Sequence, residues 1–178
     1  MLNVPSPSSL LEEQRLVALY SYDVLGEGLK DELDNLVKLA AQIAATKKAY
    51  ISFVDKTHIV FKAAYGLKTQ ARIFSRVGSI CQYAMYNDIY VVPDISQSDD
   101  FIGSPLLHSQ DNIVFYASLP LVDLDGFALG CLCLIDDETK ELTSLQMEAL
   151  QTLSLQIVTQ LSLRRKNLQL AAQTKRSE

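Results

Sequence analysis

Several features that would place this sequence in a large functional class are absent from it. No apolar run approaches the roughly 18 residues of a membrane-spanning helix, and the first residues lack the basic and apolar regions of a signal peptide. The three cysteines are an odd number, which without a signal peptide favours reduced thiols over disulfide bonds. From these absences we expect a cytoplasmic location and no membrane partner.

Phosphate-binding motifs and an excess of basic charge are also missing. Neither the dinucleotide-binding glycine pattern nor a P-loop occurs. The net charge of −5 and the pI near 5.0 argue against a nucleic-acid partner. The two histidines, His58 and His108, lie in predicted loops with no carboxylate or cysteine at the spacing of a triad or a metal site. We therefore expect surface histidines and no bound metal.

The sequence does contain enough apolar side chains for one domain, since 48% of its 178 residues are hydrophobic. Its most apolar stretch predicts a hairpin, with strands at residues 113–122 and 127–135 joined through Asp125 and Gly126. Because the second strand is apolar on both faces, it is expected at the centre of a sheet covered on both sides. One face is expected to hold Leu129, Cys131, Cys133 and Ile135, and the other Gly130, Leu132 and Leu134.

Helices and further strands are predicted around that hairpin. Strands are expected at residues 49–54, 59–64 and 90–92, and a long loop at residues 94–112. Helices are expected from a Ser9–Glu12 capping box, after an Asp31 cap, after Ser79, and from a Thr143–Gln146 capping box to about residue 172. The first helix is expected to bury Leu16, Val17, Leu19 and Tyr20.

Short links between most strands indicate an antiparallel sheet. The predicted fold class is α+β, with the terminal helices on one face of the central sheet and the short helix and long loop on the other. A pocket is expected between the sheet and the long loop.

Ten segments occur in the order typical of one known family. They are EEQRLVALYSYDVL, LDNLVKLAAQIA, ISFVD, FKAAYGL, SICQYAM, VVPD, DDF, FYASLPL, LGCLCLID and SLQMEALQTLSLQIVTQL. Over roughly residues 14–165 the chain resembles the GAF domain, most closely the bacterial subgroup that precedes histidine kinase or diguanylate cyclase domains. The resemblance implies a small-molecule pocket on one sheet face and terminal helices that pair with a second copy. The proline and small polar residues at the start predict a flexible arm (1–8). A GAF-like sensory domain (9–163) and a linker helix with its tail (164–178) are expected to follow.

The sequence departs from that subgroup beside Cys81. Gln82 and Tyr83 follow it where histidine is common in relatives that hold a bilin, a haem or a metal. We therefore expect none of these three cofactors, and the ligand remains unnamed. The Asn-Lys-Phe-Asp-Glu signature of cyclic-nucleotide-binding relatives is also absent.

Six residues are proposed to bind the ligand: Ser79, Cys81, Tyr83, Asp94, Phe101 and Tyr116. Cys81 is expected early in a short helix, where the helix N-terminus lowers the pKa of a thiol. Phe115 and Tyr116 alternate on one strand, so the sequence leaves open which of them faces the pocket. The Cys131 and Cys133 pair allows a redox or metal-binding interpretation, but two small side chains packed in a core are favoured.

Three functions are compatible with these patterns. The favoured one is a non-catalytic sensory module of bacterial signal transduction, which binds a small molecule and forms a homodimer through its terminal helices. A kinase or cyclase domain downstream is the expected effector. The alternatives are a thiol-based enzyme resembling free methionine sulfoxide reductase, acting through Cys81, and a dimerisation domain without a ligand.

Overall fold

The computed structural model describes residues 8–177, apart from the side chain of His108. Four helices, six strands and three 3-10 turns follow one another along this part of the chain. Their order is α1 (Ser9–Ser21), α2 (Lys30–Ala44), β1 (Lys48–Val54), β2 (His58–Tyr65), β3 (Ile73–Ser75), α3 (Cys81–Ala84), β4 (Tyr90–Val92), η1 (Ile95–Gln97), η2 (Asp99–Phe101), η3 (Pro105–His108), β5 (Phe115–Val122), β6 (Ala128–Asp136) and α4 (Ser144–Ser177). The predicted flexible arm lies outside the described residues except for Ser8.

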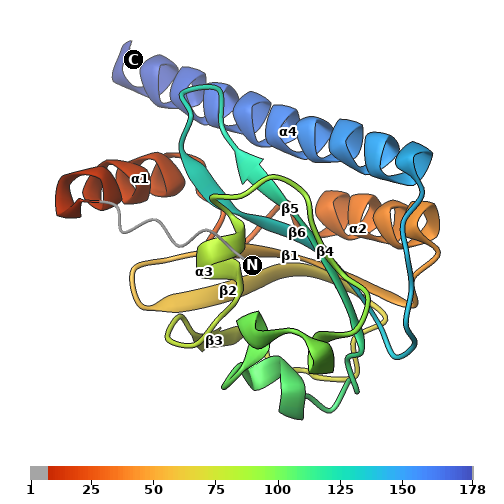
Figure 1. The fold of residues 1–178 in the computed structure, drawn as a ribbon. Helices are drawn as coiled ribbons and strands as arrows, with labels where there is room; N and C mark the ends of the chain where they lie inside the picture. The colour runs from red at the N-terminus through yellow and green to blue at the C-terminus, as the bar shows by residue number, and fades with distance from the viewer. Residues whose placement is uncertain (1–7, 178) are drawn as a thin grey trace.

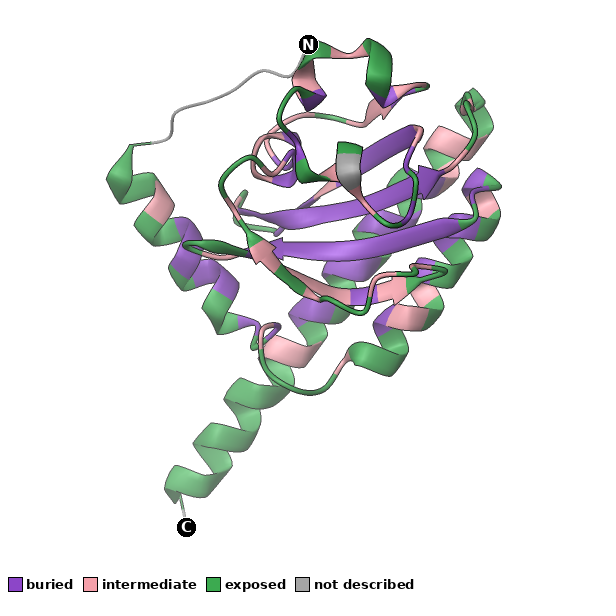
Figure 2. Cartoon of the chain, turned by 90° about the horizontal axis from the view of Figure 1, so that it is seen from below, coloured by how far each residue is buried: buried purple, intermediate pink, exposed green. Residues whose placement is uncertain are grey.

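The six strands form one antiparallel sheet in the order β3-β2-β1-β6-β5-β4. Every residue of the two central strands, β1 and β6, is buried. Helices α1, α2 and α4 cover one face (Figure 1), and α3 with the η1–η3 segment covers the other. Figure 2 shows the buried central strands between these two layers. The predicted α+β fold and its layer order are therefore confirmed.

A β-bulge in β6 changes one predicted orientation. Leu121 pairs with Gly130 and Val122 with Ala128, so Leu129 is the extra residue in the ladder. As a result Leu129 lies in the helix-covered core, and Ala128 takes its place on the opposite face. The prediction that Leu129 shares a face with Cys131 and Cys133 is wrong, because the bulge interrupts the alternation on which it was based.

The predicted N-caps of the first two helices are wrong by one and two residues, whereas that of α4 is confirmed. Ser8, not Ser9, caps α1 by accepting a hydrogen bond from the Leu11 N–H. Helix α2 begins directly after Leu29, which has a φ of +61°, so Asp31 lies in its first turn instead of capping it. At α4 the Thr143 and Gln146 side chains each accept from the other's backbone N–H, as a capping box requires.

Helix α1 buries a different face from the one predicted. Leu16 and Leu19 enter the core, but Val17 and Tyr20 are exposed and Arg15 is 98% buried, with only 2% of its surface exposed. A buried arginine is unusual unless its donors are satisfied, and the donors of Arg15 are (see below). The apolar pattern of α1 did not indicate that a charged side chain, Arg15, would be buried against the sheet.

Helix α4 extends beyond the sheet that it covers. Its buried stripe ends at Ser162, and residues 166–177 are all exposed. In Figure 2 this end of the helix projects away from the rest of the domain. Within residues 8–177 no helix combines the length and apolar character needed to cross a membrane.

Candidate functional site

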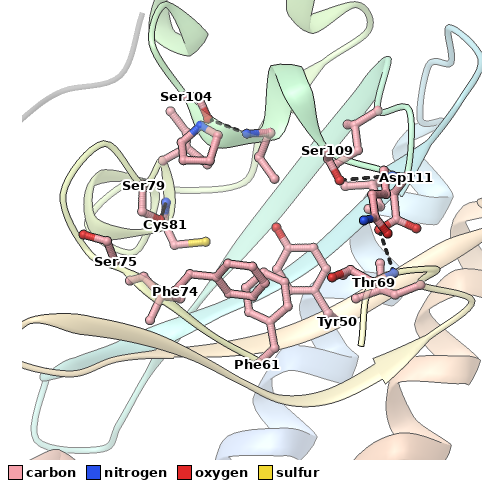
Figure 3. A pocket seen from close by; sticks show the side chains of 18 residues that line it. Tyr50, Phe61, Thr69, Phe74, Ser75, Ser79, Cys81, Ser104, Ser109 and Asp111 are labelled. Carbon is pink, nitrogen blue, oxygen red and sulfur yellow. Dashed lines mark hydrogen bonds between the residues drawn. The ribbon is translucent and has the colours of Figure 1, made fainter. Parts of the chain in front are cut away.

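A cavity of about 180 Å³ lies on the sheet face opposite the three long helices. It lies between the β1–β2 hairpin, β3, the start of α3 and the segment around η3, and it is partly open to solvent (Figure 3). Its described lining residues are Tyr50, Ile59, Phe61, Leu67, Thr69, Phe74, Ser75, Ser79, Ile80, Cys81, Ser104, Pro105, Leu106, Ser109, Gln110, Asp111, Ile113 and Ile135. The pocket expected between the sheet and the long loop is therefore present.

One wall of the cavity is aromatic. Phe61 lies opposite Ser52 in the β1–β2 ladder, so its ring reaches diagonally to Tyr50, and the two rings stack with centroids 4.1 Å apart and planes 18° apart. Phe74 on β3 continues the wall, with its ring centroid 4.6 Å from that of Phe61. None of these three rings is among the predicted site residues, because their meeting depends on the pairing of three strands.

The hydroxyl of Tyr50 is the most unusual polar group of this wall. Tyr50 is 1% exposed, and its hydroxyl has no hydrogen-bond partner among the described residues. Burial raises the pKa of Tyr50 well above its ordinary value, so the hydroxyl stays protonated and uncharged at neutral pH. Buried polar atoms normally have a partner, so an unpaired one facing a cavity is a group that a ligand can satisfy.

The long loop is anchored over the cavity by Asp111. Its carboxylate forms a buried ion pair with Lys48 (3.2 Å) and accepts a hydrogen bond from the Lys68 backbone N–H (2.6 Å). The Lys48 ammonium also donates to the Asp111 carbonyl oxygen at 2.7 Å. This arrangement joins the loop to β1 and to the β2–β3 connection. In the sequence Lys48 and Asp111 are 63 residues apart and neither belongs to a motif. Their ion pair therefore could not be predicted from the sequence.

Cys81 lines the cavity and lies beside the other two cysteines. Its Sγ is 4.0 Å from the Cys133 Sγ and 3.4 Å from the Ser52 Oγ, and all three thiols are free and buried. A hydrogen bond with Cys133 and burial raise the pKa of Cys81 well above its ordinary value. The prediction of a lowered pKa is wrong, because α3 has only four residues and the thiol is buried.

The six predicted ligand-binding residues do not come together at one place. Ser79 and Cys81 line the cavity, whereas Tyr83, Asp94, Phe101 and Tyr116 are not among its lining residues. Asp94 caps η1 by accepting from the Ser96 backbone N–H.

Phe101 and Tyr116 belong to the core beside the cavity. Both are fully buried, and the Phe101 ring packs edge-on against Tyr116 with centroids 5.2 Å apart. The strand register resolves the alternative left open above, since Tyr116 lies on the loop-covered face and Phe115 on the helix-covered face.

The cavity wall is connected to α1 through an arginine network. Arg76 directly follows the lining residue Ser75 and donates to Glu12 of α1 at 2.5 Å. Glu12 also pairs with Arg15 (2.8 Å), whose guanidinium donates to the carbonyl oxygens of Val54 (2.8 Å) and Ala128 (3.1 Å). Partial burial acts to raise the pKa of Glu12, but hydrogen bonds and charges from both arginines outweigh it and lower the pKa to about 2.

This network predicts an acid dependence of stability that can be assigned to Glu12. Because the pKa falls from an ordinary 4.5 in the unfolded chain to about 2 in the fold, the stabilisation is complete above pH 4.5 and is lost as the pH falls toward 2. Glu12→Gln is expected to lower the free energy of unfolding by about 1 kcal/mol at pH 7, a value reduced for solvent screening. At pH 3 the difference from the unsubstituted protein should shrink.

Urea unfolding at both pH values measures this effect, with Glu13→Gln as the control from the exposed side of the same helix turn. An equal effect of Glu12→Gln at pH 7 and pH 3 would contradict the role of the ionised carboxylate.

Comparisons with known proteins agree with this geometry. A model of the GAF domain matches residues 28–161. The chain belongs to the GAF domain family. A cyclic di-GMP phosphodiesterase of Pseudomonas aeruginosa is 30% identical over 141 residues, which are 79% of this chain and 23% of the relative. The chain therefore spans less than a quarter of that relative.

Solved structures share the GAF fold at low sequence identity. Free methionine-R-sulfoxide reductase from Neisseria meningitidis, solved with its substrate, has a TM-score of 0.64 and 16% identity, covering 94% of this chain and 99% of that one. A domain of a protein described as a two-component sensor histidine kinase from Sinorhizobium meliloti has a TM-score of 0.61 and 16% identity. The match covers 83% of this chain and 99% of that domain. At these identities the likeness to this GAF domain is one of fold.

Proposed function

We propose that this GAF domain is a cytoplasmic sensory module of bacterial signal transduction, which binds a small molecule in the cavity and is not itself a catalyst. The observation that carries the proposal is the partly open cavity with the unpaired, buried hydroxyl of Tyr50 in its wall. The similarity to a phosphodiesterase of cyclic di-GMP and to a sensor kinase domain supports the signalling context.

A sensor must also convert binding into a change elsewhere, and the arginine network offers a route. Ser75 and Ser79 line the cavity on either side of Arg76, which holds Glu12 of α1. A ligand that contacts this segment differently in two arrangements shifts the population between them. Helices α1 and α4 then carry the change to a downstream kinase or cyclase domain.

The thiol-reductase alternative rests on Cys81 in the cavity wall, but its protonation argues against it. A thiolate is the reactive form of cysteine, and the raised pKa of Cys81 keeps the thiol neutral. Thioredoxin-coupled reduction of free methionine sulfoxide, compared with a Cys81→Ser variant, measures this activity directly.

Thermal-shift screening against a library of soluble metabolites tests the sensory proposal. At least one compound is expected to raise the melting temperature, because a ligand of the native state stabilises it by mass action. A cavity-filling Ser79→Phe variant should abolish the shift. If no compound stabilises the domain, the ligand-free dimerisation domain becomes the better account.

The dimer half of the proposal rests on exposed leucines and valines at heptad spacing. Leu163 and Leu170 on α4 are 51% and 61% exposed, and Leu10 and Val17 on α1 are 61% and 70% exposed. Each pair is seven residues apart, the spacing by which helices form a seam with a partner helix. We propose that a second copy of this chain covers them.

Leu163→Glu with Leu170→Glu is expected to weaken dimerisation by at least tenfold, because two charges would enter the seam. Sedimentation of the unsubstituted chain should give twice the 19.8 kDa of the monomer at tens of micromolar. Leu124→Glu, at an 82% exposed position in the β5–β6 turn, is the control. A monomer at that concentration without any substitution would refute the proposal.

A further inference from the structure

We propose that the ligand of this cavity is a small uncharged ring compound, of one or two fused rings with a hydrogen-bond acceptor, and not a nucleotide or another anion. This inference rests on the proposed sensory function and names the chemical class that the cavity accepts. It follows from the size of the cavity, its aromatic wall, its charge and the hydroxyl of Tyr50.

The size of the cavity limits the ligand to few atoms. A cavity of about 150 Å³ lined by apolar side chains is known to take a benzene molecule, whereas drug-sized ligands occupy roughly 300–1,000 Å³. At about 180 Å³ this cavity has room for a single ring or a compact fused pair. A base, a sugar and a phosphate together exceed that space.

The wall of the cavity favours a flat molecule. Tyr50, Phe61 and Phe74 present neighbouring rings to it, and rings attract one another in offset-stacked or edge-to-face arrangements. Figure 3 shows these three rings grouped on one side, with Ser79 and Cys81 on another. An aromatic ligand in the cavity can therefore stack on one of these rings or pack edge-on against it.

The charges of the site argue against an anionic ligand. None of the described residues that line the cavity is a lysine, an arginine or a histidine. Lys48 is already paired with Asp111, which is the only charged residue of the described lining. The other described polar side chains of the wall are neutral hydroxyls, one amide and the Cys81 thiol. A phosphate or carboxylate buried there would meet no counter-charge among the described lining residues, which makes its desolvation unfavourable.

The hydroxyl of Tyr50 supplies the specific contact. It is buried and unpaired, and in Figure 3 it points away from Phe61 toward the region between Cys81 and Ser109. A protonated phenol donates a hydrogen bond, so it selects a ligand with a ring nitrogen or a carbonyl oxygen. A hydrocarbon of the same shape would leave the hydroxyl unpaired.

Three probes of similar shape test this inference by isothermal titration calorimetry. Quinoline carries an acceptor and no charge at neutral pH, naphthalene lacks the acceptor, and quinoline-4-carboxylate is an anion. Cyclic di-GMP serves as the nucleotide probe. Quinoline is expected to bind most tightly, naphthalene more weakly, and the two anions at least tenfold more weakly than quinoline.

The variant Tyr50→Phe separates a ligand contact from a structural one. Quinoline affinity should fall about fivefold, the effect of one neutral hydrogen bond, while naphthalene affinity is unchanged. The melting temperature of the ligand-free protein should not fall, because the lost hydroxyl has no partner in the fold. Tyr116→Phe removes a hydroxyl that is equally buried but outside the cavity, so it should leave quinoline binding unchanged.

Tighter binding of either anion than of quinoline overturns the inference, and so does a Tyr50→Phe variant that binds quinoline with full affinity. In both cases the sensory function stands if the bound compound occupies the cavity. If neither the probes nor any compound of the metabolite library binds, the sensory proposal fails, and this inference fails with it.

Discussion

Gly130→Ala is expected to destabilise the domain strongly, because the added methyl group has no room between the two central strands. A Cβ atom at this position would lie 1.8 Å from the Ser52 carbonyl oxygen and 2.9 Å from the Phe53 Cα, both backbone atoms of β1. Strands β1 and β6 are the two central strands and are buried along their whole length, so neither can move aside. Overpacking of a core typically costs about 1–3 kcal/mol, and here we expect about 3 kcal/mol or more.

Urea unfolding followed by circular dichroism measures the loss. The matched control is Gly103→Ala, where the added Cβ meets nothing within 4 Å but the backbone has a φ of +76°. That control should lose only the roughly 1–2 kcal/mol of a left-handed backbone conformation. If Gly130→Ala is no worse than Gly103→Ala, the close approach of the two strands does not constrain position 130.

Asp111→Asn is expected to lower the free energy of unfolding by about 3–5 kcal/mol, the usual loss when one partner of a buried ion pair is removed. The side chains of Lys48 and Asp111 are 7% and 1% exposed, so the remaining ammonium cannot be hydrated in place. The amide still accepts one hydrogen bond in place of the carboxylate. The substitution keeps the shape of the side chain but removes its charge and one of the two oxygens that accept from the Lys68 and Thr69 backbone N–H groups.

The same substitution should loosen the loop over the cavity. Amide hydrogen exchange over residues 94–112 and around Lys68 is expected to quicken, while exchange in α2 should change only through the global loss of stability. Asp137→Asn is the control, since Asp137 forms its ion pair with Lys47 at the surface. Unchanged exchange in the loop would show that Asp111 does not hold it.

Much of the fold was predictable because it follows from local patterns. The two-sided apolar strand around Cys131 and Leu132 had to be central, and Thr143 with Gln146 marked the start of α4. The errors arose where a few backbone angles or one side chain decide the outcome. Examples are the bulge at Leu129, the left-handed Leu29 before α2 and the buried Arg15.

The candidate site was less predictable, because its groups meet only through strand pairing. Ser79 and Cys81 belong to a family motif and do line the cavity, but Tyr50, Phe61 and Phe74 come from three strands whose register no local pattern specifies. Lys48 and Asp111 pair across 63 residues of chain. The raised pKa of Cys81 likewise depends on Cys133 and on burial by other segments.

The family, the antiparallel sheet with its two covering layers, and the lack of local motifs for phosphate or metal binding could all be inferred from the order of residues alone. These properties depend on the order and periodicity of residue types, which are local and additive. The size of the cavity, the unpaired state of the Tyr50 hydroxyl and the pairing of Lys48 with Asp111 became known from the three-dimensional fold. Those properties depend on distances between segments far apart in the chain, and a change of one residue in register would alter all of them.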